Sequence, residues 1–90
     1  MKRGLKLDSR DNVAVVIDNI KAGEEILVGT EVIVVINDVE MPHKIALSDI
    51  KTGEPTIKYG ASFGYATKDI VKGEHVHVHV HNVDSEKMMK

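Results

Sequence analysis

The sequence predicts an all-β fold, and three of its features support that class. Its apolar residues come in short, β-branched runs of the kind that fit a pleated surface. Glycine and proline interrupt these runs at short intervals, as they do where strands are joined by tight turns. No stretch sustains the apolar spacing of an amphipathic helix, so helix is expected to be a minor component.

The strand predictions follow in chain order. Residues 13–17 and 32–36 are the clearest strands because nearly every position in them is valine or isoleucine. Weaker extended segments are expected at residues 57–59, 63–66 and 75–83.

The length of 90 residues suits one domain, so residues 1–90 are assigned to a single domain with a polar tail, 84–90, that is expected to fray. Hydrophobic residues make up 42% of the chain, but there is no tryptophan and only one phenylalanine, so the core must be aliphatic. A domain of this size buries only about 60 to 65% of its unfolded surface. Docking onto a partner chain would raise its stability, and self-association is expected when the chain is isolated.

A short pattern recurs at residues 19–24, 49–54 and 69–74. Each copy has Asn or Asp, then isoleucine, and ends in Gly-Glu. The Asn or Asp side chain is expected to cap a single helical turn, the isoleucine to point into the core, and the glycine to end the turn in the left-handed conformation. We interpret the pattern as a turn motif that precedes the next strand and has no catalytic or binding role.

Charge and composition exclude several functions. Fourteen acidic and twelve basic residues give a net charge of -2 without a basic stripe, which disfavours nucleic-acid binding. Cysteine is absent, and with it any disulfide, thiolate nucleophile or cysteine zinc site. The apolar runs are too short for a signal peptide or a membrane span, so a cytoplasmic protein is expected.

Residues 75–81 alternate histidine and valine. In a strand this places the imidazoles of His75, His77, His79 and His81 on one side and the valines on the other. Neighbouring imidazoles, about 7 Å apart at the backbone, are close enough to share one divalent ion. We therefore predict His75, His77 and His79 as metal ligands, while a solvated polar face and a role in proton transfer remain alternatives.

Two further groups are candidate functional residues. His43 and Lys44 stand where a strand leaves a turn, and the alternative is an ordinary surface pair. Lys58, Tyr59 and Gly60 offer a cation, a phenol and a glycine that lets the backbone approach a ligand, which suits a carboxylate substrate. The alternative for this trio is a strand end with a packed tyrosine and a solvated lysine.

Four spaced motifs extend over almost the whole chain. They are Asp11-Asn12-Val13-Ala14-Val15, His43-Lys44-Ile45-Ala46-Leu47, Ile57-Lys58-Tyr59-Gly60, and the segment from Ile70 through Gly73-Glu74-His75-Val76-His77 to His81-Asn82-Val83. Together they resemble the SAF domain of the altronate and galactarate dehydratase family. The combination is specific, whereas any one motif alone is weak.

The resemblance implies a β-clip fold, which is small, strongly bent and rich in long hairpins. It also implies an accessory domain, either a small subunit or an N-terminal domain, that caps the active site of a large catalytic dehydratase subunit. Such hydro-lyases remove water from sugar acids with a divalent metal, iron first and manganese or zinc as alternatives. The chain is expected to be inactive alone.

The family motifs also imply site residues. The implied catalytic residues are His43, Lys44, Lys58 and Tyr59, and the implied substrate-binding residues are His81 and Asn82. The family usually shows three alternating histidines before the asparagine, whereas this sequence has four, so one His-Val pair is extra. Two alternatives stay open: the small subunit of a sulfolactate sulfo-lyase, and a non-enzymatic binding or chaperone module of the SAF type.

Overall fold

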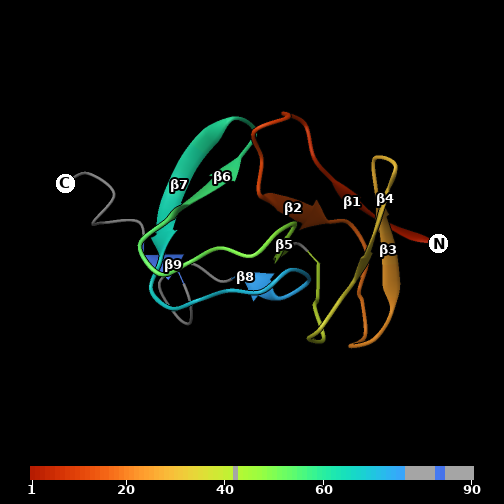
Figure 1. Ribbon diagram of the computed structural model, residues 1–90. Coiled ribbons are helices and arrows are strands. Elements are labelled where there is room, and N and C mark those ends of the chain that lie inside the picture. Colours follow the sequence, from red (N-terminus) through yellow and green to blue (C-terminus); the bar gives the residue numbers. More distant parts are fainter. Residues whose placement is uncertain (42, 77–82, 85–90) are drawn as a thin grey trace.

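The structure, a computed structural model, describes residues 1–41, 43–76 and 83–84, and consists there of strands joined by turns (Figure 1). No helix occurs among these residues, and hence none that is long and apolar enough to cross a membrane. The predicted all-β class is therefore confirmed. The strands are β1 Lys2–Leu5, β2 Val13–Val16, β3 Glu25–Val28, β4 Glu31–Val34, β5 His43–Ala46, β6 Pro55–Lys58, β7 Ala61–Ala66, β8 His75–Val76 and β9 Val83–Asp84.

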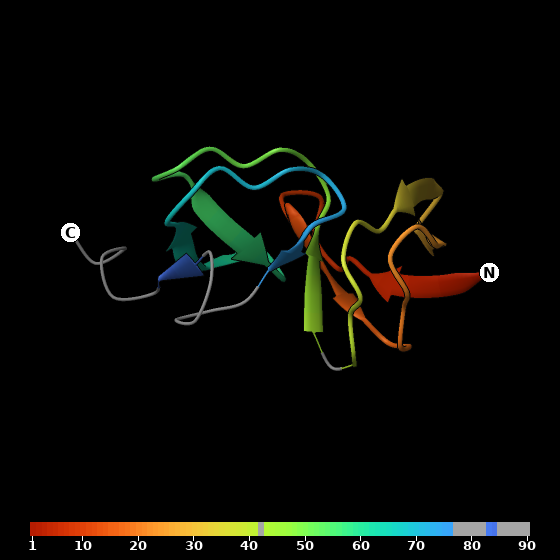
Figure 2. The same ribbon diagram turned by 90° about the horizontal axis from the view of Figure 1, so that it is seen from below.

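The described strands form two sheets. The larger has the order β4-β3-β1-β2-β5-β8, and the smaller has the order β6-β7-β9. Strand β1 runs parallel to β3, while the other neighbours are antiparallel. Both views place the β6–β7 hairpin and the β3–β4 hairpin at opposite ends of the molecule (Figures 1 and 2). This hairpin-rich arrangement is consistent with the expected SAF-like β-clip fold.

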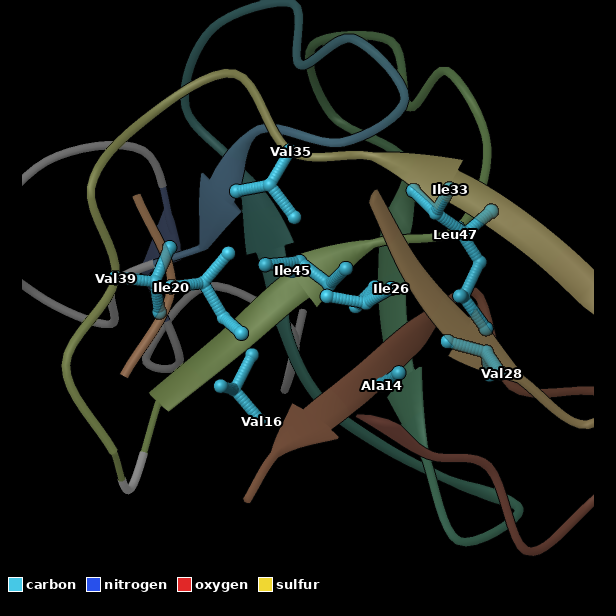
Figure 3. Packing of buried hydrophobic residues seen from close by; sticks show 10 residues of the cluster. All are labelled: Ala14, Val16, Ile20, Ile26, Val28, Ile33, Val35, Val39, Ile45 and Leu47. Atoms are coloured by element: carbon cyan, nitrogen blue, oxygen red, sulfur yellow. The ribbon is translucent and has the colours of Figure 1, made fainter. Parts of the chain in front are cut away.

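Side-chain alternation along the central strands builds two aliphatic cores. Ala14 of β2 and Ile45 of β5 belong to the first core, whose members come mainly from the larger sheet (Figure 3). Their neighbours Val13 and Ala46 point the opposite way into a second core, which lies between the sheets. Each fully buried valine or isoleucine contributes roughly 1.5 to 3 kcal/mol. Strands β2 and β5 are thus covered on both faces.

Three predictions for the recurring pattern are confirmed: its isoleucine is buried, its glycine is left-handed, and a strand follows it. The predicted single helical turn is wrong. The core isoleucines Ile20, Ile50 and Ile70 are at most 2% exposed. Each copy forms a β-turn, as where the Glu24 amide donates to the Lys21 carbonyl over 3.0 Å. Gly23, the third residue of that turn, has a φ of 91°, which suits a type II turn. A single β-turn is enough here because the next strand begins immediately.

The Asn and Asp residues of the pattern do not cap their own turns. Asp49 Oδ1 accepts a hydrogen bond from the Lys72 amide, and Asp69 Oδ1 accepts one from the Thr52 amide, each over 2.9 Å. The second and third copies therefore cap each other across the Ile50–Ile70 bridge. The first copy is capped by Asp38, which the sequence pattern did not include. The turns are thus paired devices that join distant parts of the chain.

Strands β1 and β3 were not predicted. Strand β1 has no β-branched residue, so strand propensity did not indicate it. It packs between its neighbours at Gly4, where an added Cβ would lie 3.1 Å from Val28 Cγ2 and 3.4 Å from Ala14 Cβ. A larger residue at this position would push the neighbouring side chains apart by a few tenths of an ångström. Of the strand expected at 75–83, the described residues show the two ends, β8 and β9. Asp84 of the expected tail belongs to β9, and residues 85–90 lie outside the described part.

Candidate functional site

Two lysines and two aromatic rings meet where the sheets face each other. Lys44 Nζ of β5 lies 5.3 Å from the centroid of the Phe63 ring on β7. Lys58 Nζ, at the end of β6, lies 5.9 Å from the same ring and 5.2 Å from the ring of Tyr59. Three predicted catalytic residues, Lys44, Lys58 and Tyr59, are therefore brought together. We call these four residues the lysine–aromatic cluster.

Phe63 is the member of the lysine–aromatic cluster that sequence reasoning missed. It was predicted only as a strand residue, and it packs partly against the second core. Both ammonium groups lie over its ring, an arrangement that stabilises cations by about 0.5 to 2 kcal/mol depending on desolvation. A sequence signal existed, because Phe63 is the one phenylalanine of the chain and follows the Lys58–Tyr59 pair within one hairpin.

The electrostatics of the lysine–aromatic cluster favour an anion. Burial, and then the nearby charge of Lys58, lower the pKa of Lys44 below its usual range. Among the described residues the ion pairs involve other cations, namely Lys2 with Glu24, Arg10 with Asp8, and Lys72 with Glu31. Lys44 and Lys58 thus have no carboxylate partner in this part of the chain. A bound anion would relieve their mutual repulsion.

His43 takes a different direction from Lys44. Successive side chains of a strand alternate between faces, so His43 shares a face with Ile45, and Lys44 shares the other with Ala46. The ring of His43 meets that of His75 on β8, with centroids 4.7 Å apart and planes at 88°. Both histidines are half-buried. The structure therefore separates His43 from Lys44 and pairs it with the first histidine of the alternating segment.

The histidine pair fits a metal ion only in part. Imidazole suits divalent iron, manganese and zinc, but a catalytic site usually needs about three protein ligands. No group of three or more His, Cys, Asp or Glu side chains able to hold a metal occurs among residues 1–41, 43–76 and 83–84. The predicted ligands His77 and His79 lie outside the described residues, as do the predicted substrate-binding residues His81 and Asn82.

The turn after Lys58 is a tight one with unusual backbone angles. Tyr59 has a φ of 55° and Gly60 a φ of 76°, as in a two-residue hairpin loop of type I′. An added Cβ on Gly60 would lie 2.6 Å from Asp8 Oδ2 and 2.7 Å from Arg10 Nη2. The close approach that Gly60 permits is therefore to the Asp8–Arg10 ion pair. Of the predicted group Lys58, Tyr59 and Gly60, the first two therefore belong to the lysine–aromatic cluster.

The fold and these motifs agree with a comparison against known families, in which residues 2–86 match the altronate/galactarate dehydratase SAF domain. The chain belongs to this family. The SAF domain is 43% identical over 75 residues to altronate dehydratase of Escherichia coli strain K12, covering 83% of the chain and 15% of the enzyme. With altronate dehydratase of Bacillus subtilis strain 168 it shares 40% identity over 79 residues, covering 88% of the chain and 16% of the enzyme.

A shorter part of the chain is similar to a subunit of a different enzyme, a sulfo-lyase. The SAF domain is 46% identical over 37 residues to the (2R)-sulfolactate sulfo-lyase subunit alpha of Chromohalobacter salexigens, covering 41% of the chain and 39% of that subunit. The domain thus spans about one sixth of the length of each altronate dehydratase and less than half of this subunit.

Proposed function

We propose that this SAF domain is an accessory part of a metal-dependent sugar-acid dehydratase and caps an active site formed mainly by a larger catalytic region. The similarity to two altronate dehydratases supports the assignment, since most of each enzyme lies outside the matched region. The observation that carries the site is the lysine–aromatic cluster, in which Lys44 and Lys58 share Phe63 without a described carboxylate partner. Such a cluster suits the carboxylate of a sugar acid.

The chemistry of dehydration explains why two lysines are useful. Removing water β to a carboxylate needs a base for the α-proton, positive charge to stabilise the enolate-like intermediate, and help for the departing hydroxide. Lys44 and Lys58 would bind the carboxylate equally in the substrate and in the intermediate, so their loss would raise KM. Tyr59, which is 45% exposed, would donate a hydrogen bond from its phenol. The catalytic region would supply the base.

A divalent metal, with iron first among the candidates, would be held by His43 and His75 together with ligands from the catalytic region. When bound, the ion would act as a Lewis acid that polarises substrate oxygen atoms. His77 and His79 stay predicted ligands, and His81 and Asn82 stay predicted substrate contacts. The histidine pair and the lysine–aromatic cluster lie on opposite faces of β5. A catalytic region that uses both must therefore contact the domain around the end of this strand.

The test is steady-state kinetics on the domain assembled with its catalytic region, with altronate and galactarate as substrates. Lys44→Met and Lys58→Met should each raise KM about tenfold or more, since a charge-assisted contact contributes roughly 1.5 to 3 kcal/mol. Lys68→Met is the matched control, because Lys68 is exposed and outside the cluster. Unchanged KM in both cluster variants, or enzyme-like turnover by the isolated domain, would refute the proposal.

The second candidate, a subunit of a sulfolactate sulfo-lyase, is favoured by the local similarity to subunit alpha. The same two lysines would then bind the carboxylate or sulfonate of sulfolactate. Including sulfolactate in the substrate panel separates the two enzymes. A domain that changes the turnover of none of these substrates, when added to its catalytic region, would instead be a non-enzymatic binding module.

A further inference from the structure

Asp11 is a buried carboxylate that the chemistry above does not use. It lies in the loop between β1 and β2 and is only 5% exposed. Its Oδ1 accepts a hydrogen bond from the Gly60 amide over 2.8 Å. Its Oδ2 accepts bonds from the amides of Leu7 and Asp8 over 3.3 and 3.2 Å. One side chain therefore ties its own loop to a hairpin turn 49 positions further along the chain.

The turn that Asp11 holds needs such support. Tyr59 is the one non-glycine residue with a positive φ in the described part of the chain. For an L-residue this conformation costs about 1 to 2 kcal/mol, so the surrounding contacts must enforce it. The carboxylate of Asp11, which accepts the hydrogen bond of the Gly60 amide, does so directly.

The charge of Asp11 is stabilised by the same contacts. Burial raises the pKa of its carboxyl group, but hydrogen bonds from the amides of Gly60, Tyr59, Asp8 and Leu7 lower it by more. The net pKa lies below the usual aspartate value, so Asp11 is ionised at neutral pH. Its bonds to the turn are therefore charge-assisted, which makes them roughly twice as strong as neutral ones.

We infer that Asp11 is a positioning residue, which fixes Lys58 and Tyr59 in the lysine–aromatic cluster through the Tyr59–Gly60 turn. Lys58 immediately precedes this turn, so the turn determines how its ammonium group meets the rings of Tyr59 and Phe63. Lys44 reaches Phe63 from β5 and does not depend on the turn. Asp11 thus sets the position of one lysine relative to the other. Only the identity of the anion that they bind rests on the proposed function.

The structural test is NMR spectroscopy on Asp11→Asn, which keeps the shape of the side chain and removes its charge. The ε-methylene protons of Lys58, shifted upfield by the two rings, should lose most of that shift, while those of Lys44 keep theirs. Asp38→Asn is the matched control, since Asp38 also accepts a hydrogen bond from a turn amide, that of Ala22, in a different turn. An unchanged Lys58, or an equal loss at both lysines, would overturn the inference.

The wild-type chain provides a test that does not depend on a variant folding. The amide shifts of Gly60 and Leu7, which donate to Asp11, should titrate together with the Lys58 ε-protons, at one apparent pKa below the usual aspartate value of about 3.9. Independent titration of the turn and of Lys58 would contradict the positioning role.

Kinetics on the assembled protein then separate this inference from the proposed function. Asp11→Asn should raise KM for the sugar acid about tenfold and leave kcat nearly unchanged, as expected for a misplaced binding group. If the Lys58 protons shift but KM does not change, the positioning role stands and the proposed carboxylate site fails. If Lys58→Met raises KM while Asp11→Asn alters neither KM nor the Lys58 protons, the proposed site stands and the positioning role fails.

Discussion

At the scale of single residues, the ring of Phe63 allows the ammonium groups of Lys44 and Lys58 to lie near each other in a partly buried site. The negative face of an aromatic ring attracts cations, which partly offsets the desolvation of Lys44. The sequence identified Lys44, Lys58 and Tyr59 as candidates through their motifs. It did not identify Phe63, because the contact of this ring with Lys44 depends on the packing of β7 against β5. It did not identify Asp11 either, because the burial of a loop carboxylate is a tertiary property.

We predict that Phe63→Leu lowers the pKa of Lys44 further, because the ring stabilises the charged form of the lysine. The pKa is measured by following the ε-methylene shifts of Lys44 against pH. Between the lowered pKa and the unfolded value of about 10.5, the folded state binds fewer protons, so stability should rise with pH there, and more steeply in the variant.

Tyr59→Leu is the control for this measurement. Its ring contacts Lys58, and the contact of Lys44 is with Phe63 alone among the described rings. The pKa of Lys44 should therefore decrease less in Tyr59→Leu than in Phe63→Leu. An equal decrease in both variants would show that the ring contact is not the cause.

At the scale of elements, the fold is held by turns that cap one another. The sequence correctly predicted the buried isoleucines, the left-handed glycines and the strands that follow. It could not predict which turn caps which, because the bonds from Asp49 to Lys72 and from Asp69 to Thr52 join positions set by the folded chain. Strand β1 was missed for a similar reason, since Gly4 is favoured by its neighbours and not by strand propensity.

Gly73→Ala should destabilise the protein far more than Gly23→Ala. The two glycines have nearly equal φ angles, 89° and 91°, so each alanine carries the same backbone cost of about 1 to 2 kcal/mol. An added Cβ has nothing within 4 Å at Gly23, whereas at Gly73 it would collide with the Val34 carbonyl oxygen. We expect an additional loss of about 1 to 3 kcal/mol for Gly73→Ala, as for other overpacked sites. Urea unfolding of both variants measures it, and equal losses would contradict it.

At the scale of the whole molecule, the order β2-β3-β4 is repeated by β5-β6-β7. In each half a strand is followed by the turn pattern and then by a hairpin. The halves differ in exposure, because the second hairpin packs against β2 and β5 through the second core, while β4 stands at the edge of the larger sheet. On β4, Val32 and Val34 are 45% and 53% exposed. An edge strand with exposed β-branched side chains is a typical pairing site.

We predict that the isolated chain self-associates through β4 and that Val34→Lys shifts it toward the monomer. Because Val34 is already 53% exposed, the free energy of unfolding should change by less than about 0.5 kcal/mol. Sedimentation velocity over a range of concentrations measures the shift. Met41→Lys is the control, since Met41 is similarly exposed at 51% and its amide bonds to Asn19, outside β4. Identical association of both variants would exclude β4 as the contact.

The alternation along β5 has a consequence for how such a domain can vary. His43 and Lys44 serve opposite sides of one strand, so a shift of its pairing by one residue would exchange imidazole and ammonium between the two clusters. A shift by two would return each side chain to its own side. The His-Val pair that the resemblance implies to be extra in residues 75–81 would be a step of this even kind. Insertions and deletions of an even number of residues near these strands should therefore be tolerated. Those of an odd number should remove function even where the fold survives.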